Sequence, residues 1–288
     1  MQRILLATDF SERSDRALRR AAMLARSSGA RLDLVHVVDD DRPRHIVEHE
    51  AADARSLLAE LAQSLESVEQ VSCTVQVLLA DAFAGIAQAV TDLAPDLLVI
   101  GPHRRQILRG AFVGTTAERT IRAVDCPVVM VNGPPVGPYR NVLLTTDLSE
   151  TSRTALQRFG RLGIDAEGPL HILSVYSAPA LRLAMAGTLD PEDQDAYLSD
   201  LGAQADRYLG AFLASLDDGH PVRVVRREET TTAHEVLKAA RDLGSNLIVV
   251  STQGKGAVAR MLLGSVAEQV LQLSGIDVLA IPPPRVDP

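Results

Sequence analysis

Tryptophan is absent from this chain of 288 residues, and aromatic residues together make up only 3% of it. A core built from this composition must be aliphatic, which is typical of parallel sheets that helices cover on both faces. Long apolar runs are also missing, and none approaches the length of a membrane-spanning helix. The start, residues 1–7, enters a strand pattern at once, so we expect neither a signal peptide nor a membrane partner.

Cysteine is almost as scarce, since Cys73 and Cys126 are the only two. They form neither a CxxC pair nor a zinc-binding spacing, so we expect two buried, reduced thiols in a cytoplasmic protein. Positive charge is in deficit, because the net charge is -8 and the isoelectric point is about 5.4. This balance disfavours nonspecific binding to nucleic acid or to an anionic membrane.

Internal repetition, by contrast, is abundant. The repeated pairs are residues 4–18 with 142–156 and residues 97–118 with 247–268. The repeat is far longer than a solenoid unit, so each copy is interpreted as a whole domain. The linker at residues 132–138 is rich in proline and glycine, which places the boundary near Gly137. We therefore predict two domains, residues 1–136 and residues 137–288.

Each half alternates short apolar runs with amphipathic stretches. Strands are predicted at residues 4–8, 32–38, 74–79, 97–101 and 128–131, then at 142–146, 170–176, 222–226, 247–251 and 278–281. Helices are predicted at residues 11–28, 46–65, 84–93 and 115–124, then at 149–162, 191–216, 233–243 and 265–273. This alternation predicts an α/β protein made of two tandem doubly wound, Rossmann-like parallel sheets, each with strand order 3-2-1-4-5.

The last strand of each half is apolar although it would lie at a sheet edge. Such an edge needs covering, so we expect the strands at residues 128–131 and 278–281 to be buried against each other. The two halves would then be related by a pseudo-twofold axis. One chain would form an intramolecular pseudo-dimer, and a homodimer of whole chains is the further assembly to test.

Candidate ligand-binding residues end the first strand of each half. Open α/β sheets bind ligands beyond the carboxyl ends of their strands, where Asp9 and Asp147 fall. Two residues further on, Ser11 and Ser149 are placed to cap the next helix. Turn and capping chemistry alone explains this pattern, and so does a ligand site. The repetition favours the ligand site without deciding the question, because a duplicated cap repeats too.

A second cluster follows the fourth strand of the second half. Gly254 and Gly264 leave room for the backbone to approach a ligand closely. Ser265 opens a helix and forms a capping-box pattern with Glu268. Exposed amides at a helix N-terminus suit a phosphate group, whereas the alternative interpretation is a tight turn followed by an ordinary cap.

This pattern resembles the universal stress protein family, whose signature is Gly-x2-Gly-x9-Gly-Ser/Thr after the fourth strand. The family also carries an aspartate at the end of the first strand, and the resemblance covers nearly the whole chain as two tandem domains. In the second half Gly254, Gly264 and Ser265 fit the signature, and Ser251 stands where the first glycine is usual. ATP-binding members contact adenine through the backbone of a valine that matches Val175.

The first half resembles the signature less closely. Gly101, Gly114 and Thr115 fit, and Val37 matches the adenine-contacting valine, but Arg104 replaces the middle glycine. Its guanidinium either grips phosphate oxygens as a fork or occupies the phosphate space and closes the site. The second outcome is favoured, because a position that tolerates a Cβ does not keep a glycine's clearance. The second half is therefore predicted to be the better nucleotide site.

The resemblance implies a regulatory protein of the stress response that binds an adenine nucleotide, ATP with or without Mg²⁺. No general base, nucleophile, P-loop or G-x-S-x-G elbow is evident, so we do not expect an enzyme. His45 and His49 have the spacing of a helical metal pair but no third ligand, and no metal site is predicted. The alternative is an interaction module of the same family that binds no nucleotide. The sequence does not name a protein partner.

Overall fold

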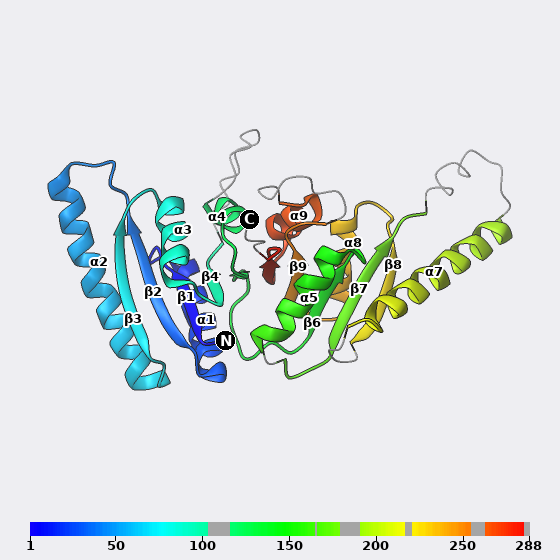
Figure 1. The fold of residues 1–288 in the computed structure, drawn as a ribbon, viewed down its shortest axis with the longest axis horizontal. Helices are drawn as coiled ribbons and strands as arrows, with labels where there is room; N and C mark the ends of the chain where they lie inside the picture. The colour runs from blue at the N-terminus through cyan, green and yellow to red at the C-terminus, as the bar shows by residue number, and fades with distance from the viewer. Residues whose placement is uncertain (103–115, 165, 179–190, 217–220, 255–262, 285–288) are drawn as a thin grey trace.

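The structure is a computed structural model that describes residues 1–102, 116–164, 166–178, 191–216, 221–254 and 263–284. Within these residues ten strands form one continuous sheet in the order β3-β2-β1-β4-β5-β10-β9-β6-β7-β8 (Figure 1). The first-half strands are β1 (Arg3–Ala7), β2 (Arg31–Val38), β3 (Cys73–Leu79), β4 (Leu97–Ile100) and β5 (Val128–Met130). The second-half strands are β6 (Val142–Thr146), β7 (Leu170–Tyr176), β8 (Val222–Arg227), β9 (Leu247–Ser251) and β10 (Asp277–Ile281).

Helices cover both faces of this sheet. The first half contributes α1 (Glu12–Ser28), α2 (Arg44–Ser64), a π-helical turn η1 (Leu65–Glu69), α3 (Ala82–Leu93) and α4 (Thr116–Ala123). The second half contributes α5 (Glu150–Leu162), α7 (Pro191–Leu213), α8 (Thr232–Asp242) and α9 (Ser265–Leu273). Figure 1 shows α2 and α7 at the two outer ends of the molecule and α4 and α9 near its middle. None of the described helices is long and apolar enough to cross a membrane.

The strands supply the core because successive side chains point to opposite faces. Ile4 and Leu6 of β1 pack on the face of α1, whereas Leu5 belongs to the apolar cluster on the other face. Each cluster contains residues of both halves, so the aliphatic core continues across the middle of the molecule. The expectation of an aliphatic, doubly covered sheet is confirmed.

Within each half the strands run parallel in the predicted order 3-2-1-4-5. The two five-stranded units join edge to edge, because β5 and β10 pair antiparallel, with Leu279 opposite Val129. The expectation that these two apolar edge strands are buried against each other is confirmed. An edge strand presents unpaired N–H and C=O groups as well as apolar side chains. Pairing the two edges satisfies the backbone groups and buries the side chains at once, and it makes one sheet from two.

A buried polar cluster stabilises the junction between the two halves, beside β5 and β10. Asp277 accepts hydrogen bonds from the backbone N–H groups of residues 132 and 133, both at 3.0 Å, and from the Tyr139 hydroxyl at 2.8 Å. Arg20 of α1 pairs with the same carboxylate at 3.1 Å, lies over the Tyr139 ring and donates to the carbonyl of Gly137 at 2.8 Å. Three segments, α1, the linker and β10, therefore meet on one carboxylate.

Candidate functional site

Each half has a cavity beyond the carboxyl ends of its strands. The first-half cavity has a volume of about 410 Å³ and the second-half cavity about 440 Å³. Asp9, Val37 and Gly101 line the first-half cavity. Asp147, Val175, Ser251, Gly254, Gly264 and Ser265 line the second-half cavity. Both cavities lie where the strand order reverses, beside the first strand of the half, which is the usual ligand position in open α/β sheets.

The turn after the first strand has the same geometry in both halves. The Oδ1 atom of Asp147 accepts hydrogen bonds from the hydroxyl of Ser149 and, at 3.0 Å, from its backbone N–H. Ser149 in turn caps α5 by accepting from the N–H of Ser152 at 3.1 Å. Leu148, between them, adopts a left-handed φ of 62°. The capping role of the serine is confirmed, and the aspartate also lines a cavity.

Asp9 has the same partner in the first half, because Ser11 donates to it from both its hydroxyl and its backbone N–H. Burial acts to raise the pKa of Asp9, but these bonds, a contribution from Ser14 and the charge of Arg13 outweigh burial and lower it. The side chain is therefore a carboxylate at neutral pH. Such a group accepts hydrogen bonds, as a ribose hydroxyl requires, and is a weak base.

Gly101 and Ser251 occupy equivalent ends of the fourth strands but have different surroundings. A Cβ at Gly101 would lie 3.0 Å from the backbone oxygen of Arg13, so α1 approaches too closely for a side chain. In the second half the hydroxyl of Ser251 donates to the carbonyl of Gln253. Packing within the protein thus favours glycine at position 101, and the serine closes a local turn.

The loop after β9 brings the two predicted clusters of the second half together. A Cβ at Gly254 would lie 3.0 Å from Oδ2 of Asp147, so the loop backbone passes directly against this carboxylate. Gly264 donates its N–H to the carbonyl of Thr252 at 2.7 Å, and a Cβ there would find an ordinary distance of 3.4 Å to the same oxygen. The remaining predicted residues, Gly114 and Thr115, lie outside the described residues, as does Arg104.

The predicted capping box at the start of α9 is wrong. The N-cap residue is Gly264, which offers no side chain, and Ser265 is the first helical residue. Glu268 instead forms an ion pair with Arg122 of α4 at 3.1 Å, across the joint between the halves. Because α9 begins at Ser265 itself, Ser265 and Glu268 each lie one position too far into the helix to form a capping box, and the first turn of α9 faces the cavity without a side-chain cap at its N-cap position.

Two residues of the first-half cavity were missed from the sequence. Arg13 lines it, whereas its counterpart in the repeat is Thr151, so aligning the two copies would have drawn attention to it. His36 also lines the cavity, in contact with Phe10 at a ring separation of 4.5 Å. The His36 Nδ1 atom lies 2.8 Å from the carbonyl of Thr8. Because a carbonyl oxygen only accepts, this nitrogen carries the proton.

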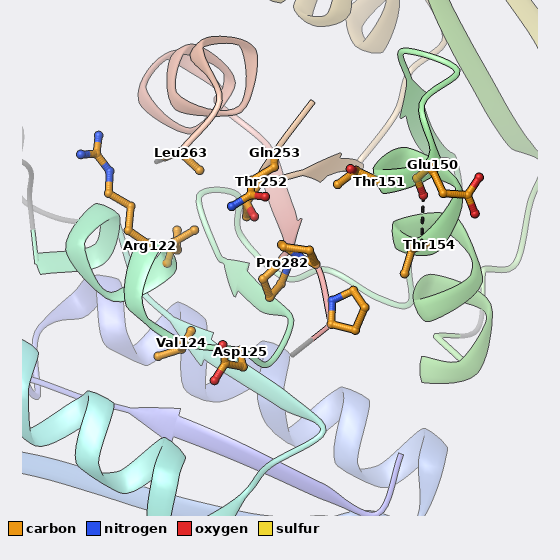
Figure 2. A pocket seen from close by; sticks show the side chains of 13 residues that line it. Arg122, Val124, Asp125, Glu150, Thr151, Thr154, Thr252, Gln253, Leu263 and Pro282 are labelled. Atoms are coloured by element: carbon orange, nitrogen blue, oxygen red, sulfur yellow. Dashed lines mark hydrogen bonds between the residues drawn. The ribbon is translucent and has the colours of Figure 1, made fainter. Parts of the chain in front are cut away.

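A third cavity, of about 280 Å³, lies between the halves (Figure 2). Figure 2 shows Val124 and Asp125 on its first-half side, with Thr154 on α5, where the hydroxyl donates to the carbonyl of Glu150 at 3.0 Å. Gln253 lines both this junction cavity and the second-half cavity. The junction cavity therefore backs onto the loop that follows β9.

Metal and thiol chemistry find little support in the described part of the chain. No group of three or more His, Cys, Asp or Glu side chains there could hold a metal ion, and His49 lies 3.6 Å from Asp53 on an exposed helix surface. Cys126 is buried as expected, but Cys73 is only half-buried. Burial raises the pKa of Cys126 to about 12 and, with nearby negative charge, that of Cys73 to about 11. Both thiols are protonated at neutral pH and are poor nucleophiles.

Comparison with known proteins assigns both halves to the same family. A model of the universal stress protein family matches residues 1–132 and again residues 138–282. A universal stress protein of Mycolicibacterium smegmatis is 25% identical over 311 residues, covering 97% of both chains. One from Mycobacterium tuberculosis is 25% identical over 304 residues, covering 96% of this chain and 95% of that protein.

Solved structures agree in fold. The crystal structure of a universal stress protein from Archaeoglobus fulgidus superposes with a TM-score of 0.69 at 20% identity, covering 97% of this chain and 98% of that one. A functionally unknown protein of Pseudomonas aeruginosa gives a TM-score of 0.71 at 19% identity, covering 98% and 93%. Since the family model matches both halves, this chain belongs to the universal stress protein family and carries its domain twice.

Proposed function

We propose that the protein is a regulatory adenine-nucleotide-binding protein of the stress response, with its better site in the second half. The observation that carries the proposal is that the backbone at Gly254 lies against the Asp147 carboxylate, beside a helix start, that of α9, which has no side-chain cap. These groups line a cavity of about 440 Å³. Ligand pockets of small molecules span roughly 300–1,000 Å³, so the cavity has a suitable size.

The chemistry of the wall suits the parts of ATP, with or without Mg²⁺. Asp147 would accept a hydrogen bond from a ribose hydroxyl, and the backbone at Val175 would pair with the edge of adenine. The first-turn amides of α9, from Ser265 onward, would receive phosphate oxygens, because unsatisfied N–H groups and the helix dipole favour an anion. Gly264 would leave room for the phosphate, since its own N–H is used by the Thr252 carbonyl. Ser251 and Gly254 would shape the loop that lies against the ligand.

The first half would offer a second, less preserved site. Asp9 and Val37 would take the roles of their counterparts, and Gly101, Gly114 and Thr115 would form the loop. Arg104 in this loop decides whether phosphate has room there. We place the domain boundary at residue 137 and expect the protein to work in the cytoplasm.

A sensing rather than a catalytic role fits the titratable groups. A general base works best with a pKa near the working pH, and the pKa of Asp9 is lowered instead. The two thiols are held protonated by their raised pKa values. We therefore propose that any hydrolysis of ATP is slow and is not the main role.

The competing proposal is an interaction module of the same family that binds no nucleotide. It is favoured by the findings that the close approach of α1 accounts for a glycine at position 101 and that Ser11 and Ser149 act as helix caps. These features need no ligand to explain them.

Mass spectrometry of small molecules released from the purified, denatured protein tests the two proposals, together with calorimetric titration by ATP. Retained ATP, or saturable heat on titration, supports the nucleotide-binding function. An empty protein that gives no heat with millimolar ATP would leave the interaction module as the better account.

A further inference from the structure

The two cavities differ at one position in the first turn of the following helix. Counting from the equivalent aspartates, Asp9 and Asp147, the fourth residue is Arg13 in the first half and Thr151 in the second. Arg13 lines the first-half nucleotide cavity. Thr151 lines the junction cavity between the halves and not the second-half nucleotide cavity. The first half therefore has a guanidinium group at its cavity where the second half has a neutral hydroxyl that faces elsewhere.

Arg13 interacts with the charge of Asp9 but has no hydrogen-bond or ion-pair partner in the part of the chain that the structure describes. It is half-buried, yet no hydrogen bond or ion pair of its side chain is found there. Arg16, one turn further along α1, is exposed and donates to the carbonyl of Asn132 at 3.5 Å. Arg20 is buried and paired with Asp277. Of these three arginines of α1, only Arg13 lines the cavity, and only its side chain makes no hydrogen bond to a described residue.

The position of Arg13 is unfavourable for a cation unless an anion is present. It is the second residue of α1, where the helix dipole is positive and acidic side chains are preferred. Glu12 and Asp15 in the same turn follow that preference, and Arg13 does not. Asp9 offsets part of the charge, because Arg13 helps to lower the pKa of this carboxyl. Helix stability alone therefore gives no reason for an arginine at this place.

A guanidinium group is well matched to phosphate. Its five N–H donors form a planar fork that binds two oxygens at once, and its charge strengthens each bond. Arg13 lines the same cavity as Asp9, which would hold the sugar. The cavity thus presents an acceptor for a hydroxyl group and a cation for an anionic group.

We propose that Arg13 is a phosphate-recognising residue that makes the first-half cavity selective for nucleotides over nucleosides. This inference rests on the proposed function, since it assumes that the cavity takes an adenine compound. It assigns the selectivity to the charge at position 13, whose equivalent in the second half is the neutral Thr151.

The test requires one half at a time, and the chain offers a matched pair of blocking positions. Thr232 and Ala82 are the first residues of α8 and α3, and each lines the cavity of its own half. Thr232→Trp should fill the second-half cavity, and Ala82→Trp should fill the first. Ala82 is exposed and Thr232 is half-buried, so the fold should tolerate the change. The chain has no other tryptophan, so the fluorescence of each variant also reports whether the introduced indole is buried in its cavity.

In the Thr232→Trp protein we would measure dissociation constants for ATP and for adenosine, with and without Arg13→Thr. Loss of a charge-assisted bond to phosphate should weaken ATP binding by about tenfold and change adenosine binding by less than about twofold. The salt dependence of ATP binding should fall as well. Arg16→Thr removes the same charge from the same helix outside the cavity, and it should leave both constants unchanged.

Equal losses for ATP and adenosine, no loss for ATP, or the same loss from Arg16→Thr would each overturn the inference. These results leave the proposed function standing, because ATP still binds the unsubstituted first half. Failure of the proposed function gives a different result, since neither the original protein nor either tryptophan variant would then bind ATP or adenosine, and the inference would fall with it.

Discussion

The two halves of this protein share the turn that opens each site but differ in the walls around it. Asp9 and Asp147 are held by the same serine contacts, and Phe10 and Leu148 have nearly the same left-handed φ, 58° and 62°. These contacts span only two or three residues, so each copy reproduces them without help from its surroundings. Residues that touch distant segments have diverged instead.

The outer helices illustrate this divergence. Gly85 of α3 lies so close to β2 that a Cβ would come within 2.6 Å of Cγ1 of Val37. The equivalent residue of α8, counted from the N-cap, is Glu235, which is buried and leaves Oε1 without a hydrogen-bond partner among the described residues. A helix with a side chain at this place cannot approach its strand as closely. The cavity wall next to Val37 therefore differs from the wall next to Val175.

The largest expected effect comes from the joint, where the halves stop being equivalent. The counterpart of Asp277 in the first half is Pro127, so only one side of the pseudo-twofold axis has this carboxylate. Asp277→Ala should lower the free energy of unfolding by about 3–5 kcal/mol, because Arg20 would be left buried and unpaired. Urea denaturation measures the loss. Asp242→Ala, which breaks an exposed pair with Arg226, is the control and should change little.

A smaller effect should separate the ends of the fourth strands. Gly101→Ala forces a methyl group against the backbone oxygen of Arg13 at 3.0 Å and should cost about 1–3 kcal/mol of stability. Ser251→Ala removes one hydrogen bond to Gln253 and should cost about 1 kcal/mol or less. Equal losses in urea denaturation would show that the two strand ends are packed alike, contrary to the structure.

Gly264→Ala should separate folding from binding. A Cβ at this position lies at an ordinary 3.4 Å from the carbonyl of Thr252, so the unfolding free energy should be nearly unchanged. ATP binding should weaken by about tenfold, equivalent to about 1.4 kcal/mol, because the methyl group enters the proposed phosphate site. Calorimetry checks this, with Gly114→Ala as the first-half counterpart and a smaller expected loss. Unchanged ATP binding in a protein that binds ATP would contradict the assignment.

The smallest effect concerns pH. The folded pKa of Asp9 lies below its ordinary 3.8, so its ionised form stabilises the fold above that pH, and the contribution is lost as pH falls through the folded value. Asp9→Asn should therefore be less stable than the original protein near neutral pH. The difference should shrink in acid, below about pH 3.8. A difference in unfolding free energy that does not vary with pH would contradict the lowered pKa.

Much of the fold could be predicted because its signals are local. The bounds of β7, β9 and α9 agree with the sequence expectation residue for residue, since each element has a clear apolar period and a turn at its ends. The π-helical turn at Leu65–Glu69 was not predicted, because a change of helix type leaves no distinct periodic pattern. The capping box at Ser265 failed for another reason, since α9 begins one residue earlier than that pattern assumes, with Gly264 at the N-cap.

The candidate site divides in the same way. Asp147, Gly254 and Gly264 could be named from the repeat, but that Gly254 lies against the Asp147 carboxylate follows only from the packing of the loop on the first turn. Arg13 carries no motif, and it becomes notable only because it lines a cavity and has no hydrogen-bond or ion-pair partner among the described residues. Sequence patterns identify residues at turns, whereas a cavity is lined by segments that lie far apart in the sequence.

By itself the sequence determined the duplication, the order of strands and helices, and the capped turns at Ser11 and Ser149, because these depend on contacts between near neighbours. Only the tertiary structure decided that two sheets become one through β5 and β10 and that Asp277 gathers Arg20, Tyr139 and the linker. Backbone groups at a sheet edge look alike in any sequence. Their partner is chosen by which buried surfaces and charges the folded chain brings to the same place.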